Sequence, residues 1–378
     1  MPCESHFPNF PITKLLNYQI LYVAYPLLTV SEESAGGAEQ MLWTLDREVS
    51  GLGVATTVAA SAGSRVSGEL FSTGAPCIQP DDFERRNREH QEKVIEFVRT
   101  RARQGRPFDL LHDQSGSFWP RAAEVDAPVL ATLHLPRHFY PAHSFEHVPA
   151  NVGFNCVSAS QARDFADLKS MLGVIPNGIL LERFLTNGVL RSDVPKNGLL
   201  WLGRICEEKG THLALDIASR AGLNITIAGQ VYPFTYHQQY FEKEIAPRLR
   251  KMPNATFIAS PSAQQKCRLL KEARAVLITS MVNETSSLVA MEAAASGTAV
   301  IAFRQGALPE IVQNGTTGFL VDGVDDAVQA LNKVEQIKPA VCIEHAKENF
   351  SSKTMSQRYA RLYGQLRQSQ PQTEILTA

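Results

Sequence analysis

The stretch AVLITSMVNETSSLVAMEAAASGTAVIAF, residues 275–303, predicts a strand, a helix and a second strand in close succession. Its two ends, 275–279 and 298–303, are short apolar runs with several β-branched residues, as expected of buried strands. Between them, every residue from Leu288 to Ala295 is apolar except Glu292. A helix that is apolar on all sides is a buried helix. The stretch therefore indicates an α/β fold in which helices cover a parallel sheet.

The same alternation of strands and helices continues along most of the chain, and a long charged helix is predicted over 83–103. It implies two doubly wound parallel-sheet domains that face each other across a cleft, with ligands at the carboxyl ends of the strands. The predicted strands are 18–25, 54–60, 108–112, 128–134, 155–158, 199–202, 224–228, 255–258, 275–279, 298–303 and 318–321.

The length of 378 residues also favours two domains. The less regular segment 181–197 closes on Pro195, Lys196 and Asn197 and is the predicted linker. We therefore expect an N-terminal domain over 1–180 and a C-terminal domain from residue 198 on.

Composition restricts the class of function. Hydrophobic residues make up 44% of the chain and charged residues 20%, which is typical of a soluble globular protein. The net charge of −1 provides no basic field for nucleic acid. Six scattered cysteines without a Cys-x-x-Cys pair predict reduced thiols and no metal site. With no signal-peptide pattern over 1–17 and no apolar run of membrane-spanning length, we expect a cytoplasmic protein.

Two glutamates are the strongest indication of function. Glu292 lies inside the apolar helix, where a carboxylate is costly unless a partner satisfies it. Glu284 lies just before the N-terminus of the same helix. The functional interpretation places both at a cleft. The alternative is structural, with Glu284 as a favourable charge at a helix start and Ser286 or Ser287 as a simple N-cap.

Two loops at predicted strand ends suit an anionic ligand. Gly36 and Gly37 precede the first helix, where glycines allow close approach and free N–H groups attract an anion. Arg204 and Lys209 follow the strand 199–202 and suit phosphate oxygens. The structural alternatives are a tight turn for the glycines and two solvated charges for the loop.

Two histidines, His112 and His134, each close a predicted strand. They are interpreted as a polar cleft wall, or else as structural residues. A metal site is not expected here, because the sequence has no third ligand at a suitable spacing. The charged helix 83–103 mixes both signs, which favours a solvated face with i,i+4 pairs over a patch that docks on anionic lipid.

In combination, these motifs resemble the retaining nucleotide-sugar glycosyltransferases of family 4, which have the GT-B fold. The resemblance runs from the Gly36-Gly37 loop to the C-terminus. It includes Glu284 and Glu292 as a Glu-x7-Glu pair, Gly203-Arg204 with Lys209-Gly210, Asn177-Gly178-Ile179, Thr132-Leu133-His134, and 299–312 with 314–321. It implies a C-terminal domain over 198–350 and helices over 351–378 that return to the N-terminal domain.

The resemblance also implies roles. Glu292 would bind the donor ribose, and Glu284 the transferred sugar near its 3- and 4-hydroxyls. Arg204 and Lys209 would neutralise the diphosphate leaving group without a metal, and His134 would contact the transferred sugar. Further substrate contacts are expected at Gly36, Gly37, Ser287, Leu288, Val289, His112 and Asn177.

The implied reaction moves a hexosyl group from a UDP- or GDP-sugar, with no other cofactor, to a hydroxyl of a sugar, a lipid-linked glycan or a small molecule. Peripheral contact with the inner membrane face is a further expectation. Thr285-Ser286-Ser287 departs from the family, which often has Pro or Gly followed by Phe-Gly there. The departure motivates one alternative, a non-catalytic sugar-nucleotide-binding protein. A GT-B sugar-nucleotide epimerase is another.

Overall fold

The computed structural model describes residues 15–34, 36–77, 80–141, 143–185 and 198–368. It divides into two compact units. The N-terminal unit runs to Val157 and also takes in Ala162–Ile175 and the chain from Lys353 on, whereas Ser158–Gln161 and Pro176–Ser352 form the C-terminal unit. Most of the predicted linker, 186–197, lies outside the described residues, as do 1–14 and 369–378.

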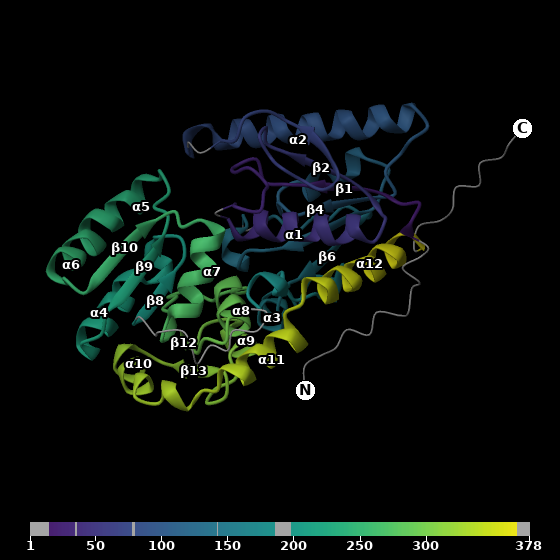
Figure 1. Cartoon of the computed structure of the whole chain (residues 1–378). Coiled ribbons are helices and arrows are strands. Elements are labelled where there is room, and N and C mark those ends of the chain that lie inside the picture. Colours follow the sequence, from purple (N-terminus) through teal and green to yellow (C-terminus); the bar gives the residue numbers. More distant parts are fainter. Residues whose placement is uncertain (1–14, 35, 78–79, 142, 186–197, 369–378) are drawn as a thin grey trace, which may run out of the picture. The chain divides into compact units, whose positions relative to one another are not determined.

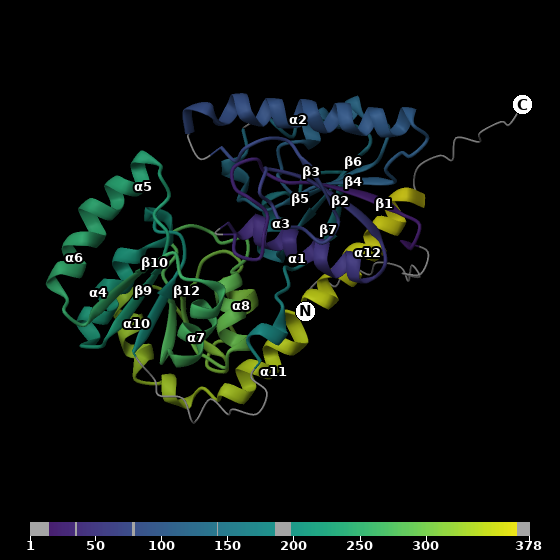
Figure 2. The same cartoon turned by 45° about the horizontal axis from the view of Figure 1, so that its top comes forward.

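The N-terminal unit is built on a parallel sheet of seven described strands in the order β3-β2-β1-β4-β5-β6-β7. Helix α2 (Pro80–Arg103) lies on one face of this sheet, and α1 (Gly37–Gly51) and α12 (Ser352–Gln368) lie on the other (Figures 1 and 2). A shorter helix, α3 (Ala159–Asp164), is divided between the units. The strands are β1 Gln19–Val23, β2 Ala55–Ala60, β3 Glu69–Ser72, β4 Leu110–Asp113, β5 Val129–Leu133, β6 Val152–Cys156 and β7 Met171–Val174.

Alternation along the strands gives this sheet two buried faces. Leu21 and Val23 of β1 pack in one apolar cluster with Val94 and Val98 of α2. The side chain between them, Tyr22, points to the opposite face, where its hydroxyl lies 3.4 Å from that of Tyr363 on α12. The C-terminal helix therefore completes the core of the N-terminal unit.

The C-terminal unit has a parallel sheet of six described strands in the order β10-β9-β8-β11-β12-β13. The strands are β8 Leu199–Leu202, β9 Ile225–Gly229, β10 Ala255–Ala259, β11 Ala275–Ile278, β12 Val300–Phe303 and β13 Gly318–Val321. The helices are α4 Thr211–Ala221, α5 Thr235–Tyr240, a π-helical stretch Phe241–Ile245, α6 Ala246–Lys251, α7 Ala263–Glu272, α8 Leu288–Ala295, α9 Leu308–Ile311, α10 Val324–Leu331 and α11 Pro339–Asn349.

This second sheet also buries both faces. Trp201 and Leu277 pack with α4 and α10 in one cluster, while Leu200 and Val276 pack with α8 and α11 in another. Short 3-10 turns occur at Trp119–Glu124, Arg137–Phe139, Leu181–Arg183, Glu207–Lys209 and Val334–Gln336.

The predicted fold class, two doubly wound parallel sheets as in GT-B, is confirmed. Two elements differ from the sequence prediction. Strand β7 was not predicted; it ends at Val174, two residues before Pro176, which supplies no N–H for a ladder, and Ile179 forms an isolated bridge to Ser351. The edge strand β3 was missed, since its half-exposed residues Glu69–Ser72 are too few for a clear pattern.

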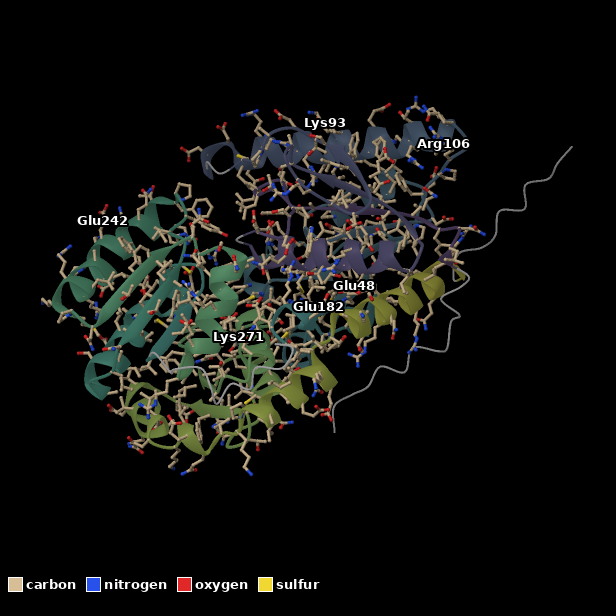
Figure 3. The ribbon with its side chains drawn as sticks, in the orientation of Figure 1. Glu48, Lys93, Arg106, Glu182, Glu242 and Lys271 are labelled. Carbon is tan, nitrogen blue, oxygen red and sulfur yellow. The ribbon has the colours of Figure 1, made fainter. Side chains whose placement is uncertain are left out.

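Helix α2 carries mixed charges, as the sequence predicted. Arg85 pairs with Asp82 at 3.0 Å and with Glu89 at 2.8 Å, both along the exposed surface of the helix. Lys93, labelled in Figure 3, donates to the carbonyl oxygen of Thr73 at 2.8 Å. Across the described residues, no helix combines the length and apolarity that crossing a bilayer requires.

Candidate functional site

The strand order of the C-terminal unit reverses between β8 and β11, the point at which doubly wound sheets bind ligands. The loop after β8 carries Arg204 and Lys209, and the loop after β11 leads to Glu284. The two loops are joined, because the Thr279 hydroxyl donates to the Gly210 carbonyl oxygen at 2.7 Å. Gly210 has φ +63°, and a Cβ there would lie 2.1 Å from the Thr279 carbonyl oxygen. Only glycine permits this approach.

Glu284 and Lys209 meet at this point. The Lys209 Nζ lies 2.5 Å from Glu284 Oε1, and the Glu284 side chain is only 10% exposed. The Ser280 hydroxyl donates to the same carboxylate oxygen. Gly306 fixes the backbone here, since a Cβ on it would lie 2.2 Å from the Glu284 carbonyl oxygen, which also accepts from the Ala307 N–H at 2.7 Å. The carboxylate is thus held rigidly at the strand ends.

Glu292 has a different cation as its partner. It is 4% exposed within α8, and its Oε1 lies 2.5 Å from Nζ of Lys266 on α7. The prediction that this buried carboxylate needs a partner is confirmed. Its Oε2 has no hydrogen-bond partner among the described residues. Lys266 was not predicted as this partner, because one lysine on a separate amphipathic helix carries no motif.

The N-terminus of α8 lies between the two glutamates in sequence. Ser287 is the N-cap, and its hydroxyl accepts from the Ala290 N–H at 3.3 Å. Leu288 and Val289 form the first turn, where backbone N–H groups have no intrahelical acceptor. The Ser286 hydroxyl is buried without a partner in the described part of the chain. The N-cap alternative for Ser287 is therefore correct, and it leaves the first-turn N–H groups for a ligand.

Arg204 lies over an aromatic ring at the start of the same loop. Its guanidinium carbon is 5.6 Å from the Tyr232 ring centroid. Burial lowers the pKa of Arg204, but the nearby Cys206 and Tyr232 outweigh burial and raise it overall, so the side chain stays cationic. The C-terminal unit therefore brings Lys209 and Glu284 together just before α8, while Arg204 lies earlier in the loop after β8.

In the N-terminal unit, Gly36 and His134 lie at the ends of strand-to-helix segments. Gly36 is the N-cap of α1, and a Cβ there would lie 1.9 Å from the Glu39 carboxylate. Gly37 begins the helix and is exposed. His134 Nε2 lies 2.7 Å from Gln114 Oε1, and burial lowers the pKa of His134 to about 4, which keeps the imidazole neutral.

His112 has surroundings that favour the structural alternative. It is fully buried, with Nδ1 2.7 Å from the Tyr363 hydroxyl and Nε2 2.7 Å from the Thr132 hydroxyl. Both ring nitrogens thus have partners inside the unit, which favours a core residue, and the expected substrate contact at His112 stays a prediction. Asn177 is also buried, beside Gly178, whose Cβ position lies 2.7 Å from the Ser351 carbonyl oxygen.

A further cluster has the composition of a metal site. One ligand atom each from Cys206, Glu208 and His237 lies within 4.8 Å of the others. No metal was expected from the sequence. Its spacing does not connect these residues, because His237 belongs to the helix after a different strand.

Comparison with known families finds a match within the C-terminal unit. Residues 186–349 match the family described as glycosyl transferases group 1. This match covers less than half of the chain. The chain is similar to lipopolysaccharide 1,2-N-acetylglucosaminetransferase of Salmonella typhimurium, with 24% identity over 223 residues, which is 56% of this chain and 52% of that protein. It is 30% identical over 181 residues to D-inositol 3-phosphate glycosyltransferase of Mycolicibacterium smegmatis, covering 46% and 42%. The matches thus span about half the length of these relatives.

Solved structures resemble the whole described chain. Sucrose-phosphate synthase from Thermosynechococcus elongatus matches with a TM-score of 0.75 and 18% identity, covering 94% of this chain and 100% of that one. HepE of Anabaena, solved in complex with UDP and glucose, matches with a TM-score of 0.72 and 17% identity, covering 92% and 100%. At these identities the likeness establishes the GT-B fold alone.

Proposed function

We propose that the chain is a retaining glycosyltransferase that moves a hexosyl group from a nucleotide-diphosphate sugar to an acceptor hydroxyl. The observation that carries the proposal is the pair of carboxylates Glu284 and Glu292, each paired with a lysine in the unit that matches glycosyl transferases group 1. Glu292 is buried and Glu284 is half-buried. Carboxylates accept hydrogen bonds from sugar hydroxyls, and cations beside them suit a diphosphate.

Glu292 is the proposed ribose contact. Its Oε1 is paired with Lys266, and its Oε2, which has no partner among the described residues, is an acceptor that a hydroxyl can use without breaking the ion pair. A buried acceptor without a donor costs free energy. A ligand that supplies a donor removes this cost, which favours its binding. The UDP in the HepE structure supports a nucleoside diphosphate here, and we propose a UDP- or GDP-sugar as the donor.

Glu284 is the proposed contact to the transferred sugar, and Lys209 serves two partners. An ammonium has three donors, so Lys209 can keep its bond to Glu284 and also donate to a diphosphate oxygen. Arg204 and the first-turn N–H groups of α8 supply further donors. During transfer, the bond between the anomeric carbon and the diphosphate oxygen breaks while a bond to the acceptor oxygen forms on the same face. The acceptor proton passes to the departing diphosphate oxygen. These donors stabilise the charge that develops there, with no metal in the step.

A donor screen tests this function. Unfolding midpoints are measured with UDP, GDP, ADP and their glucose-type sugars, and stabilising donors are then assayed for slow hydrolysis and for transfer. We expect stabilisation by one nucleoside diphosphate and release of sugar with retained anomeric configuration. Glu292→Ala should weaken donor binding, while Glu284→Ala should mainly lower turnover. If no nucleotide stabilises the protein, the proposal is wrong.

A non-catalytic sugar-nucleotide-binding protein is the second candidate. The observation that favours it is Thr285-Ser286-Ser287, where Ser286 places a buried hydroxyl beside the proposed sugar site. Stabilisation by a donor without hydrolysis or transfer would support this candidate, and release of an epimerised sugar would instead support an epimerase. Ser286→Gly and Ser287→Gly, made singly, show whether the serine side chains limit turnover.

A further inference from the structure

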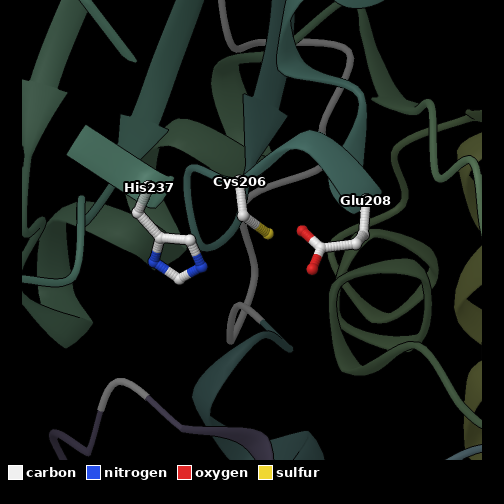
Figure 4. Close-up of side chains that lie close together, drawn as sticks. All are labelled: Cys206, Glu208 and His237. Atoms are coloured by element: carbon white, nitrogen blue, oxygen red, sulfur yellow. The ribbon is translucent and has the colours of Figure 1, made fainter. Parts of the chain in front are cut away.

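Three side chains of different chemistry converge beside the loop after β8. Cys206 lies within that loop, Glu208 belongs to its 3-10 turn Glu207–Lys209, and His237 belongs to α5. Figure 4 shows Cys206 between the other two, with its sulfur directed toward the Glu208 carboxylate and the His237 ring on the other side. Their ligand atoms lie within 4.8 Å of one another.

His237 is the unusual member. It is 0% exposed, and neither ring nitrogen has a hydrogen-bond partner among the described residues. Its ring is surrounded by Phe234 and Tyr236, at centroid distances of 5.2 and 4.2 Å. Buried polar atoms in folded proteins nearly always have a partner, so a bare buried imidazole requires an explanation. Oε2 of Glu208 is buried and unpartnered in the same way.

We propose that Cys206, Glu208 and His237 bind a divalent transition-metal ion, with Zn²⁺ as the best fit. Thiolate sulfur, imidazole nitrogen and carboxylate oxygen are the three ligand types of protein zinc sites, and hard cations such as Mg²⁺ avoid sulfur. Three protein ligands leave a fourth tetrahedral position for a water. Ligand atoms around Zn²⁺ lie about 3.5 Å apart, so closure from the observed spacing needs only small side-chain rotations.

The charges around the cluster are compatible with this ion. On binding, the Cys206 thiol releases its proton to solvent, and the resulting thiolate and the Glu208 carboxylate balance the charge of Zn²⁺. Arg204 is the opposing group, since its charge acts on Cys206 and His237. Because two anionic ligands neutralise the charge of Zn²⁺, Arg204 can still bind an anionic ligand on its own side of the loop. The ion is therefore separate from the transfer step.

The site would fasten several elements of the C-terminal unit. Ile205 N–H already donates to the Gln230 carbonyl oxygen at 2.9 Å, which joins the loops after β8 and β9. The Glu208 carbonyl oxygen accepts from the Met281 N–H at 2.8 Å, which adds the loop after β11. A metal between Cys206 and His237 would bind α5 to the same set, and ligation of the folded state alone raises its stability.

Metal binding to the purified full chain tests the site without any glycosyl donor. After chelator treatment, Zn²⁺ is titrated in competition with a chromophoric chelator, and Co²⁺ is titrated while the absorption of thiolate-to-cobalt charge transfer is recorded. We expect one Zn²⁺ per chain, a higher unfolding midpoint with Zn²⁺, and a charge-transfer band. Cys206→Ser should abolish the band, and His237→Ala should weaken Zn²⁺ binding at least tenfold.

Matched controls separate this cluster from adventitious binding. Cys267→Ser changes a half-buried cysteine elsewhere in the unit, and His143→Ala an exposed histidine; both should bind as the parent does. Glu208→Gln keeps the shape of a less buried ligand. If Cys206→Ser does not fold, weaker Zn²⁺ binding by Glu208→Gln, with the charge-transfer band retained, is the expected result instead. Sub-stoichiometric binding, absence of the band, or equal binding by the cluster variants would overturn the proposal. None of these outcomes depends on glycosyl transfer, so this inference and the proposed function fail separately.

Discussion

The two units place polar residues at the carboxyl ends of equivalent strands but treat them differently. In the N-terminal unit, His112 on β4 is part of a neutral buried network that continues through Thr132 to Asn155 and Tyr359. In the C-terminal unit, the loop after β11 and helix α8 carry Glu284 and Glu292, and each is paired with a lysine.

The two sets of residues differ in whether every polar atom has a hydrogen-bond partner. The hydroxyls and imidazole around His112 satisfy one another at distances of 2.7 to 3.2 Å, and two members of the network, Tyr359 and Tyr363, come from α12. One oxygen of the Glu292 carboxylate has no hydrogen-bond partner in the described part of the chain. A satisfied neutral network fixes a core, whereas an incompletely satisfied charge pair retains capacity for a ligand.

The largest expected effect tests the charged side of this comparison. Arg204→Ala should lower kcat by about 10²–10³-fold, because it removes one donor from the developing diphosphate charge. Turnover of the donor identified by the screen is the measurement. Arg248→Ala, which removes an arginine paired with Asp216 on the surface of the same unit, is the control and should leave kcat unchanged. An unchanged rate for Arg204→Ala would exclude this arginine from the mechanism.

Lys266→Met should lower the free energy of unfolding by about 3 kcal/mol, since it leaves the Glu292 charge buried without a cation. Urea unfolding of the parent and the variant measures the loss. The double variant Lys266→Met/Glu292→Gln removes the charge and should regain most of it. Loss of stability in Lys266→Met without recovery in the double variant would indicate that Lys266 acts through packing rather than through the pair.

The residues that were predicted well are those whose chemistry is decided locally. An apolar helix with one carboxylate signals burial and an ion pair, and Glu292 has both. The identity of its partner is decided by packing, so Lys266 carried no signal. For His112, the sequence gives the position along the strand but not what covers the face, which here is α12 from the far end of the chain. The cluster of Cys206, Glu208 and His237 was also missed, because packing brings together residues from separate loops and helices.

His112→Ala tests the neutral side. It should lower the free energy of unfolding of the N-terminal unit by about 2 kcal/mol, because it leaves the Tyr363 and Thr132 hydroxyls without their nearest partner and opens a cavity. Donor affinity should not change. Chemical unfolding and donor titration are the two measurements, with the exposed His143→Ala as control. Weakened donor binding at unchanged stability would support His112 as a substrate contact.

The smallest effect is a pH dependence that belongs to the N-terminal unit. His90 is 1% exposed, and burial, then the charges of Arg86 and Lys93, lower its pKa to about 3. The folded unit therefore keeps this imidazole neutral, while the unfolded chain takes up a proton below about pH 6.5. Because the unfolded state then binds more protons, stability falls as pH falls, by about 1 kcal/mol per pH unit for one such histidine. His90→Gln should flatten the slope of unfolding free energy between pH 6 and pH 5 even where it lowers stability overall. A slope unchanged by His90→Gln would mean that His90 is already protonated in the folded unit, and the contrast between a neutral N-terminal network and a charged C-terminal site would then not extend to this residue.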